Sequence, residues 1–136
     1  MRTTLTSTCM MLMGLLVCGV SLSAHHGSAV FDTAKTVTVK GRVTQFLWTN
    51  PHILLRVDSV DDNGKAVHWL IEHQAPANMA NFGWTKTMFK AGDDVEIDVT
   101  PVKNYALQGT TIGRFRERIV INGHEFKPGE PINAKP

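Results

Sequence analysis

The chain has 136 residues, of which 43% are hydrophobic, 7% aromatic and 19% charged. This composition is too apolar for a disordered protein, and the length is too short for two full domains, so one globular domain is predicted. The net charge of +2 gives no electrostatic basis for binding nucleic acid or another polyanion.

The first 24 residues have the pattern of an export signal. Arg2 is the only charged residue before Asp32, and residues 9–20 are an uninterrupted apolar run. That run suits the hydrophobic region of a signal peptide, but it is shorter than the roughly 20 residues that span a bilayer. The small residues Ser21, Ser23 and Ala24 follow this run, and they fit cleavage either after Ser23 or after Ala24. We therefore expect a periplasmic protein with no membrane segment after processing.

Both cysteines, Cys9 and Cys18, lie within residues 1–24. The mature chain then carries no thiol, which excludes disulfides, thiolate metal sites and cysteine nucleophiles. What remains is predicted to be one folded domain over residues 25–126, followed by a proline-containing, flexible tail over residues 127–136.

The first predicted strand covers residues 36–47, where apolar and polar residues alternate with the period of a half-buried strand. Its inward positions are Val37, Val39, Val43 and Leu47. Gly41 interrupts the inward face and predicts a bulge or a barrel corner. By the same alternation, Trp48 falls on the polar side.

Two further strands, over residues 52–60 and 66–73, follow a turn at Asn50 and Pro51. The segment Asp62-Asn63-Gly64 fits a three-residue hairpin loop with Gly64 in the left-handed conformation. This loop pairs residue 59 with 67 and residue 55 with 71. The resulting register separates the apolar residues Ile53, Leu55, Val57, Val67, Trp69 and Ile71 from the polar residues Arg56, Asp58, His68 and Glu72.

A short helix is predicted between Pro76 and Gly83, and strands are predicted over residues 93–102 and 110–121. Three strands, a short helix and two strands is the element order of an OB-fold, an all-β, five-stranded Greek-key barrel. An open β-sandwich is the alternative.

Six histidines are the most distinctive feature of the composition. Cleavage after Ala24 would give His25 a free amine that chelates a metal together with its imidazole, and His26, His52 or His73 would complete a nitrogen-rich set that favours Cu(II). Cleavage after Ser23 would instead place a histidine third in the chain, where an amine and two amides form a square-planar site. The alternative is that His25 and His26 are surface residues without a ligand.

His52 begins the second strand and His73 ends the third, so both lie at the same end of one hairpin. They are either a ligand pair across the barrel mouth or strand-end residues hydrogen-bonded to neighbouring carbonyls. His68 faces Asp58 in the predicted register. His124 lies in a turn and lacks the second histidine of a metalloprotease motif.

The last predicted strand carries Arg114, Arg116 and Arg118 on one face. These arginines are either an anion site or cross-strand partners of the acidic residues Glu96 and Asp98. Glu117 points the opposite way in this alternation, which places it near the barrel end or buries its carboxylate.

Trp48 and Trp84 are candidates to line a mouth of the barrel, whereas Trp69 belongs to the core by its alternation. The sequence contains no nucleophile elbow, phosphate-binding loop, dinucleotide fingerprint or paired catalytic carboxylates. It therefore gives no positive indication of an enzyme.

Several segments, taken together, resemble one known family. They are Ala24-His25-His26, Phe31-Asp32, Trp48-Thr49-Asn50-Pro51-His52, Trp69 with Ile71-Glu72, Gly83-Trp84-Thr85 and Lys90-Ala91-Gly92-Asp93. They are similar to small exported proteobacterial proteins catalogued only as a domain of unknown function. The resemblance extends to about Val102 and implies a periplasmic single domain, without supplying an activity or a ligand.

The sequence thus favours an exported barrel that binds something small, with one copper ion as the leading ligand at His25, His26, His52 and His73. Trp48, Asn50, Glu72 and Trp84 are expected to contact the ligand or a partner at the same barrel end. The alternative is a metal-free adaptor whose segment from Trp48 to His52 contacts a protein of the cell envelope.

Overall fold

Six strands, one short helix and one 3₁₀ turn make up the part of the chain that the computed structural model describes, residues 28–104 and 110–127. In chain order they are η1 (Ser28–Val30), β1 (Val37–Leu47), β2 (Leu54–Val60), β3 (Ala66–Glu72), α2 (Pro76–Ala80), β4 (Asp94–Pro101), β5 (Thr110–Ile121) and β6 (His124–Glu125). The predictions for the export segment, for His25 and His26, and for the tail from residue 128 lie outside the described residues.

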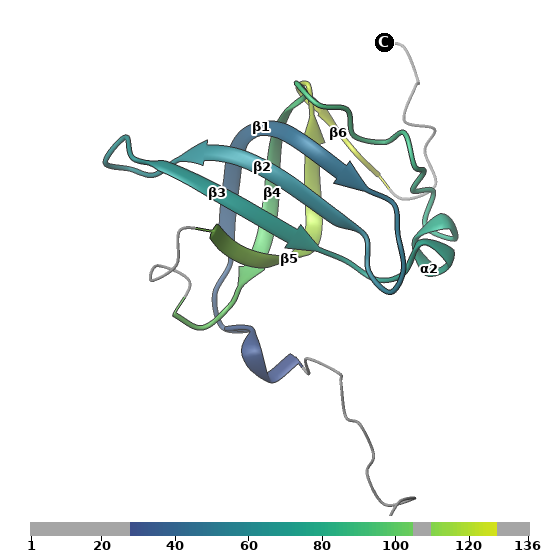
Figure 1. The fold of residues 1–136 in the computed structure, drawn as a ribbon, viewed down its shortest axis with the longest axis horizontal. Helices are drawn as coiled ribbons and strands as arrows, with labels where there is room; N and C mark the ends of the chain where they lie inside the picture. Colours follow the sequence, from purple (N-terminus) through teal and green to yellow (C-terminus); the bar gives the residue numbers. More distant parts are fainter. Residues whose placement is uncertain (1–27, 105–109, 128–136) are drawn as a thin grey trace, which may run out of the picture.

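The strands form one sheet in the order β3-β2-β1-β4-β5-β6, and a parallel pairing of β3 with β5 closes five of them into a barrel (Figure 1). Around the barrel the order is therefore β1-β2-β3-β5-β4, with α2 inserted between β3 and β4, which is the arrangement of an OB-fold. The prediction of a small all-β barrel is confirmed over that of an open β-sandwich. No helix in the described residues is long and apolar enough to cross a membrane.

The β2–β3 hairpin has the predicted register. Val57 pairs with Trp69 and Leu55 pairs with Ile71, so the apolar faces of both strands point into the barrel. At the turn, Gly64 has a φ of 77°, and the carboxylate of Asp61 accepts hydrogen bonds from the backbone N–H groups of Asn63 and Lys65, both at 2.9 Å. Loop chemistry and hydrophobic alternation therefore select the same register.

The bulge in β1 lies at Thr44 rather than at Gly41. The pairing with β2 advances by two residues on β1 and one on β2 between Val43 and Gln45. An extra residue reverses the alternation beyond it. Phe46, in register with Leu55, therefore packs against the core where Leu47 was predicted, and Trp48 also packs against the core instead of facing the polar side.

Gly41 lies at the corner where β1 pairs with β2 on one side and with β4 on the other. A Cβ atom at this position would meet the carbonyl oxygen of Asp58, and it would lie 2.9 Å from Cγ1 of Val57. Only glycine lets the two strands approach so closely, so the prediction of a barrel corner is correct.

A second irregularity explains the position of Glu117. Between the pairs Ile97–Ile119 and Val99–Phe115, β5 contains two more residues than β4. Phe115 and Ile119 both remain buried, while Glu117 lies on the exposed, bulged segment between them. Its carboxylate is therefore exposed instead of buried in the barrel.

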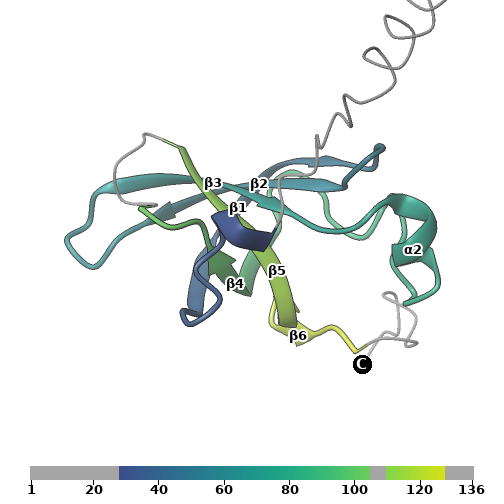
Figure 2. The same cartoon turned by 90° about the horizontal axis from the view of Figure 1, so that it is seen from below.

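The sequence did not predict β6. Asn122 and Gly123 have φ values of 51° and 83°, which turn the chain back so that His124 pairs with Ile121. Phe126 then donates its backbone N–H to the carbonyl of Ile119 at 2.8 Å and packs against the core. Figure 2 shows β6 and α2 on either side of one end of the barrel.

The core combines inward residues of the five barrel strands with a group from the connection between β3 and β4. That connection contributes Met79, Trp84, Met88 and Phe89, each 4% exposed or less. They cover one end of the barrel, where a cylinder of five strands is otherwise open.

Candidate functional site

A cleft of about 820 Å³ opens between the α2 segment and the bulged part of β5. This volume falls in the range of small-molecule sites, which are mostly apolar with few polar groups. Its apolar lining consists of Met79, Phe82, Trp84, Phe115, Ile119 and Phe126. Phe82 is 52% exposed although it is a large apolar residue.

The rings in and behind this cleft pack edge to face. Trp84 lies perpendicular to Phe115 at 5.1 Å between ring centroids and nearly perpendicular to Phe126 at 6.0 Å. The imidazole of His73 meets Trp84 edge-on at 5.2 Å and stacks on Phe115 at 5.7 Å. These offset and perpendicular contacts are the arrangements that aromatic rings prefer.

His73 is the polar group held among these rings. Burial, with a smaller contribution from the positive charge of Arg114, lowers the pKa of His73 from 6.5 to about 4, so the imidazole is neutral at pH 7. Neither ring nitrogen has a hydrogen-bond partner among the described residues, and the side chain lines the cleft. A neutral imidazole offers one donor and one acceptor to whatever enters.

The rim of the cleft contains charges of both signs. Arg118 contacts the carboxylate of Glu96 at 3.4 Å, while the carboxylate of Asp98 accepts a hydrogen bond from Thr38 at 2.7 Å. Arg118 thus has one of the predicted cross-strand acidic partners, whereas Arg116 has other partners. Arg116 donates instead to the hydroxyl of Thr100 at 2.9 Å and to a backbone carbonyl, because the bulge in β5 changes its direction.

A second cluster lies on the outer side of the barrel and centres on Glu72. One carboxylate oxygen of Glu72 lies 3.4 Å from Nδ1 of His52, and the other accepts a hydrogen bond from Arg114 at 3.1 Å. The guanidinium of Arg114 also lies over the ring of Phe31, 4.2 Å from its centroid. The contact between His52 and Glu72 joins two residues of the predicted site.

Phe31 anchors the segment before β1 at this cluster. It is 4% exposed and forms a β-bridge with Val102. The adjacent Asp32 donates its backbone N–H to the carbonyl of Pro101 at 2.8 Å, and Lys103 donates to the carbonyl of Val30 at 2.9 Å. The segment that follows His25 and His26 is therefore anchored to the same structure that holds Glu72.

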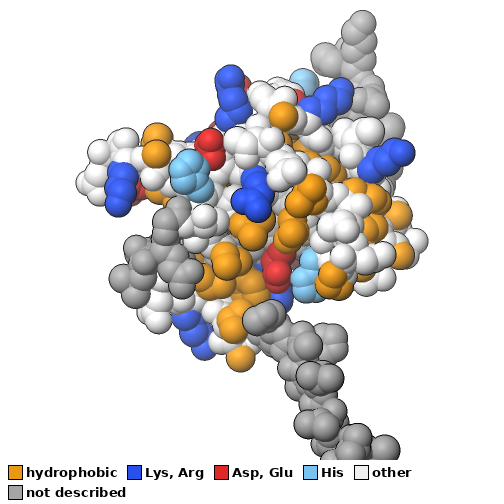
Figure 3. All heavy atoms as spheres, viewed as in Figure 1, with side chains coloured by type: hydrophobic (Ala, Val, Ile, Leu, Met, Phe, Trp, Pro, Cys, Tyr) orange, Lys and Arg blue, Asp and Glu red, His pale blue; other side chains and the backbone are white. Residues whose placement is uncertain are grey.

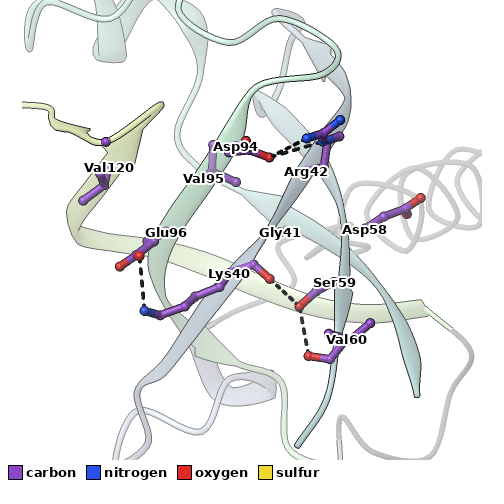
Figure 4. A pocket seen from close by; sticks show the side chains of 11 residues that line it. Lys40, Gly41, Arg42, Asp58, Ser59, Val60, Asp94, Val95, Glu96 and Val120 are labelled. Carbon is purple, nitrogen blue, oxygen red and sulfur yellow. Dashed lines mark hydrogen bonds and ion pairs between the residues drawn. The ribbon is translucent and has the colours of Figure 1, made fainter. Parts of the chain in front are cut away.

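A shallower hollow of about 530 Å³ lies on the outer face where β1 crosses between β2 and β4 (Figure 4). Its charges are neutralised by one another: Lys40 pairs with Glu96 at 3.1 Å, and Arg42 pairs with Asp94 at 3.1 Å. Hydrogen bonding by Lys40, with a smaller effect from Arg118, lowers the pKa of Glu96. On the face shown in Figure 3, basic side chains are scattered instead of gathered in one patch. These cross-strand pairs account for the charges without a ligand.

The structure brings some of the predicted site residues together and separates others. His73 joins Trp84 inside the barrel end, whereas His52 and Glu72 meet on the outer side, because consecutive residues of a strand point to opposite faces. Trp48 contacts Phe46 at 6.1 Å between centroids, and ring contacts through Phe46 and Phe89 connect it to Trp84. Asn50 lies exposed beside the cis peptide that precedes Pro51.

Other histidines have simple structural partners. His68 lies 2.7 Å from the carboxylate of Asp58, as the hairpin register predicts. His124 is exposed in β6. Within residues 28–104 and 110–127, no three histidine, cysteine or acidic residues lie close enough to hold a metal together. The predicted ligands His25 and His26 lie outside that part of the chain, so the metal set stays a prediction.

Three residues of these two clusters escaped the sequence analysis. Phe31 gave no signal beyond the family resemblance, and Arg114 was predicted to bind an anion or to pair with strand four, whereas it pairs with Glu72 of β3. Phe126 follows a turn whose Asn-Gly pair is a hairpin signal. That signal would have predicted β6 and the aromatic side chain beyond it.

The strand order and the inserted helix define a small OB-type barrel. The chain belongs to a family of unknown function, DUF6152, which matches residues 13–112. No curated protein and no solved structure matches the chain.

Proposed function

We propose that the chain is an exported, periplasmic domain that binds one Cu(II) ion through His25, His26 and His52. The observation that carries this proposal is the contact between His52 and Glu72, in a cluster that Arg114 connects to Phe31. Export rests on the apolar run and small residues of the first 24 positions.

Glu72 prepares His52 for coordination. A carboxylate 3.4 Å from Nδ1 favours the tautomer with the proton on Nδ1, which would leave the lone pair of Nε2 for a metal. Metal-binding histidines commonly have such a carboxylate partner, which fixes the ring and raises its basicity. Arg114 in turn holds the other oxygen of Glu72, so the carboxylate is fixed from both sides.

The proposal requires that the chain between Phe31 and His26 be long enough to span the distance to His52. The ring of Phe31 lies 4.2 Å from the guanidinium of Arg114, the guanidinium lies 3.1 Å from one oxygen of Glu72, and the other oxygen of Glu72 lies 3.4 Å from His52. With the widths of the guanidinium and carboxylate included, this path is about 15 Å long. His26 precedes Phe31 by five residues, and roughly 3.3 Å per extended residue, or 2 Å in a 3₁₀ turn, lets its imidazole cover that path.

Cu(II) suits this ligand set because imidazole and amine nitrogens in a tetragonal arrangement favour it over harder ions. His73 is not included, since its ring lies among Trp84 and Phe115 on the other side of the sheet. Protons compete with the metal for the histidines, so the affinity for copper should fall as the pH is lowered.

The test is native mass spectrometry of the protein recovered from the periplasm, with one equivalent of Cu(II), followed by a competition titration for affinity. We expect one bound copper on a chain that begins at His25 or Ala24. His52→Ala should weaken binding, and Glu72→Gln should weaken it by about 10-fold or more because His52 loses its orienting partner. His68→Ala is the matched control, since His68 is also an exposed histidine beside a carboxylate.

Equal affinity in the His52→Ala and His68→Ala variants would remove His52 from the site. A processed chain that holds no copper would contradict the proposal as a whole. That result would favour the metal-free adaptor, whose contact surface is the exposed loop from Trp48 to His52.

A further inference from the structure

The aromatic cleft has no part in the copper site, and it has the properties of an independent binding site. Its apolar lining comes from separate parts of the chain, namely α2, the segment after it, β5 and the residue after β6. Phe82 remains half exposed at the entrance, although burying an aromatic side chain is favourable by about 2 kcal/mol. A ligand in the cleft would cover this ring.

The polar groups of the cleft favour an uncharged ligand. Two arginines and two acidic residues share the rim, so the rim has no net charge to attract an ion. Arg118 already contacts Glu96, and Arg116 is held by Thr100 and by a backbone carbonyl. The cleft is also lined by the hydroxyl of Thr36, the amide of Gln74 and the imidazole of His73, and no hydrogen bond joins the ring nitrogens of His73 to a described residue.

The geometry of the rings favours a flat ligand. Trp84 meets Phe115 at 88° and Phe126 at 82°, and because Trp84 and Phe115 are only 4% and 5% exposed, they form the floor of the cleft. A planar aromatic molecule extends this packing, with its own faces against edges and its edges against faces. A cleft of about 820 Å³ accommodates one or two fused rings with a substituent.

We propose that this cleft binds an uncharged, planar aromatic molecule that carries one hydroxyl or carbonyl group, and that this group hydrogen-bonds to His73. The rings of Trp84, Phe115 and Phe126 supply the apolar contact, and Phe82 closes over the ligand from the entrance. A ligand that fills the cleft removes water from the ring nitrogens of His73, and leaving these nitrogens without a hydrogen bond costs free energy. A ligand with a polar substituent that hydrogen-bonds to His73 avoids this cost.

The test is equilibrium dialysis of the exported chain at pH 7 with 2-naphthol and with naphthalene as probes. Binding of 2-naphthol should be saturable at one site and tighter than that of naphthalene. In His73→Phe, which keeps the stacking ring, the affinity for 2-naphthol should fall about 3- to 10-fold, the range of one hydrogen bond, while naphthalene is unaffected. His68→Phe is the control for a surface histidine.

Phe82→Ala provides a second variant that should fold normally, because the side chain is half exposed. It should weaken both probes alike, as expected for loss of apolar contact. Copper should not change either affinity, so the two sites can fail independently.

Four results would overturn the proposal. The first is the absence of saturable binding, and the second is an equal loss of both probes in His73→Phe. The third is tighter binding of 2-naphthoate that depends on Arg116, which would make the ligand an anion. The fourth is binding that requires deletion of residues 128–136, because the occupant would then be the chain's own tail.

Discussion

Replacing Gly41 with alanine tests the account of how β1 closes the barrel. The added Cβ would collide with the carbonyl oxygen of Asp58 and would lie 3.0 Å from its carbonyl carbon. Both atoms belong to the backbone of β2 and cannot move by a change of rotamer. One of the two strands must shift, and that shift would loosen the pairs on both sides of Gly41.

Overpacking of a well-packed interior costs about 1–3 kcal/mol, and a collision with backbone belongs at the upper end of that range. We therefore expect Gly41→Ala to lower the free energy of unfolding by about 3 kcal/mol. Domains of this size have roughly 5–15 kcal/mol in total, so the loss is a large fraction. In urea, with a slope of about 1 kcal/mol/M, the midpoint should fall by about 3 M.

The matched control is Gly123→Ala. Gly123 has a φ of 83°, and no atom lies within 4 Å of the place that an alanine methyl group would take, so only the cost of a left-handed alanine, about 1 kcal/mol, applies. The two urea curves, followed by tryptophan fluorescence, separate steric collision from backbone strain. If Gly41→Ala costs no more than Gly123→Ala, the close approach of β1 and β2 is not what requires glycine at the corner.

The remaining predictions concern pH, the hairpin turn and the Glu72 cluster. The pKa of His73 is lowered to about 4 in the folded chain, so as the pH falls below 6.5 the unfolded chain takes up a proton that the folded chain does not. The free energy of unfolding therefore decreases from about pH 6.5 down to about pH 4, below which both states are protonated. Between pH 7 and 4.5 the wild type should therefore lose about 1–2 kcal/mol more than His73→Phe in urea denaturation, a figure reduced for the partial exposure of the ring; equal losses would contradict a neutral, buried imidazole. Asp61→Ala removes the acceptor of two turn hydrogen bonds and should cost about 1 kcal/mol, measured by thermal unfolding against Asp62→Ala as control. Arg114→Met should lower the free energy of unfolding by about 1–2 kcal/mol because a half-buried ion pair and a ring contact are lost together. In the control Arg42→Met, whose pair with Asp94 is exposed, the change should stay within about 0.5 kcal/mol. Similar values for both variants would show that the Glu72 cluster adds nothing beyond a surface pair.

Local chemistry explains why much of the barrel could be predicted. The alternation in β2 and β3 agreed with the only loop that Asp62, Asn63 and Gly64 could form, and β5 was predicted over its full length of Thr110–Ile121. In these segments one hydrophobic face and one turn type leave a single register.

The wrong predictions lie where a strand contains extra residues relative to its partner strand, which its own hydrophobic alternation does not show. The bulge at Thr44 reversed the side assigned to Trp48, and the bulge before Ile119 exposed Glu117 and redirected Arg116. A bulge depends on the partner strand, so alternation along one strand cannot reveal it. The same limit applies to the candidate site: the hairpin placed His52 and Glu72 near each other, but only the β3–β5 pairing adds Arg114.

The parallel contact between β3 and β5 also has a consequence for how the chain folds. Glu72 and Arg114, which meet across it, are 42 residues apart in sequence. Strands β1 to β3 cannot bury their inner faces as a closed cylinder until β5, the last of the barrel strands, is available. Such long-range closure is slow compared with hairpin formation. A chain that emerges with its N-terminus first therefore cannot close the barrel until β5, Thr110–Ile121, has appeared.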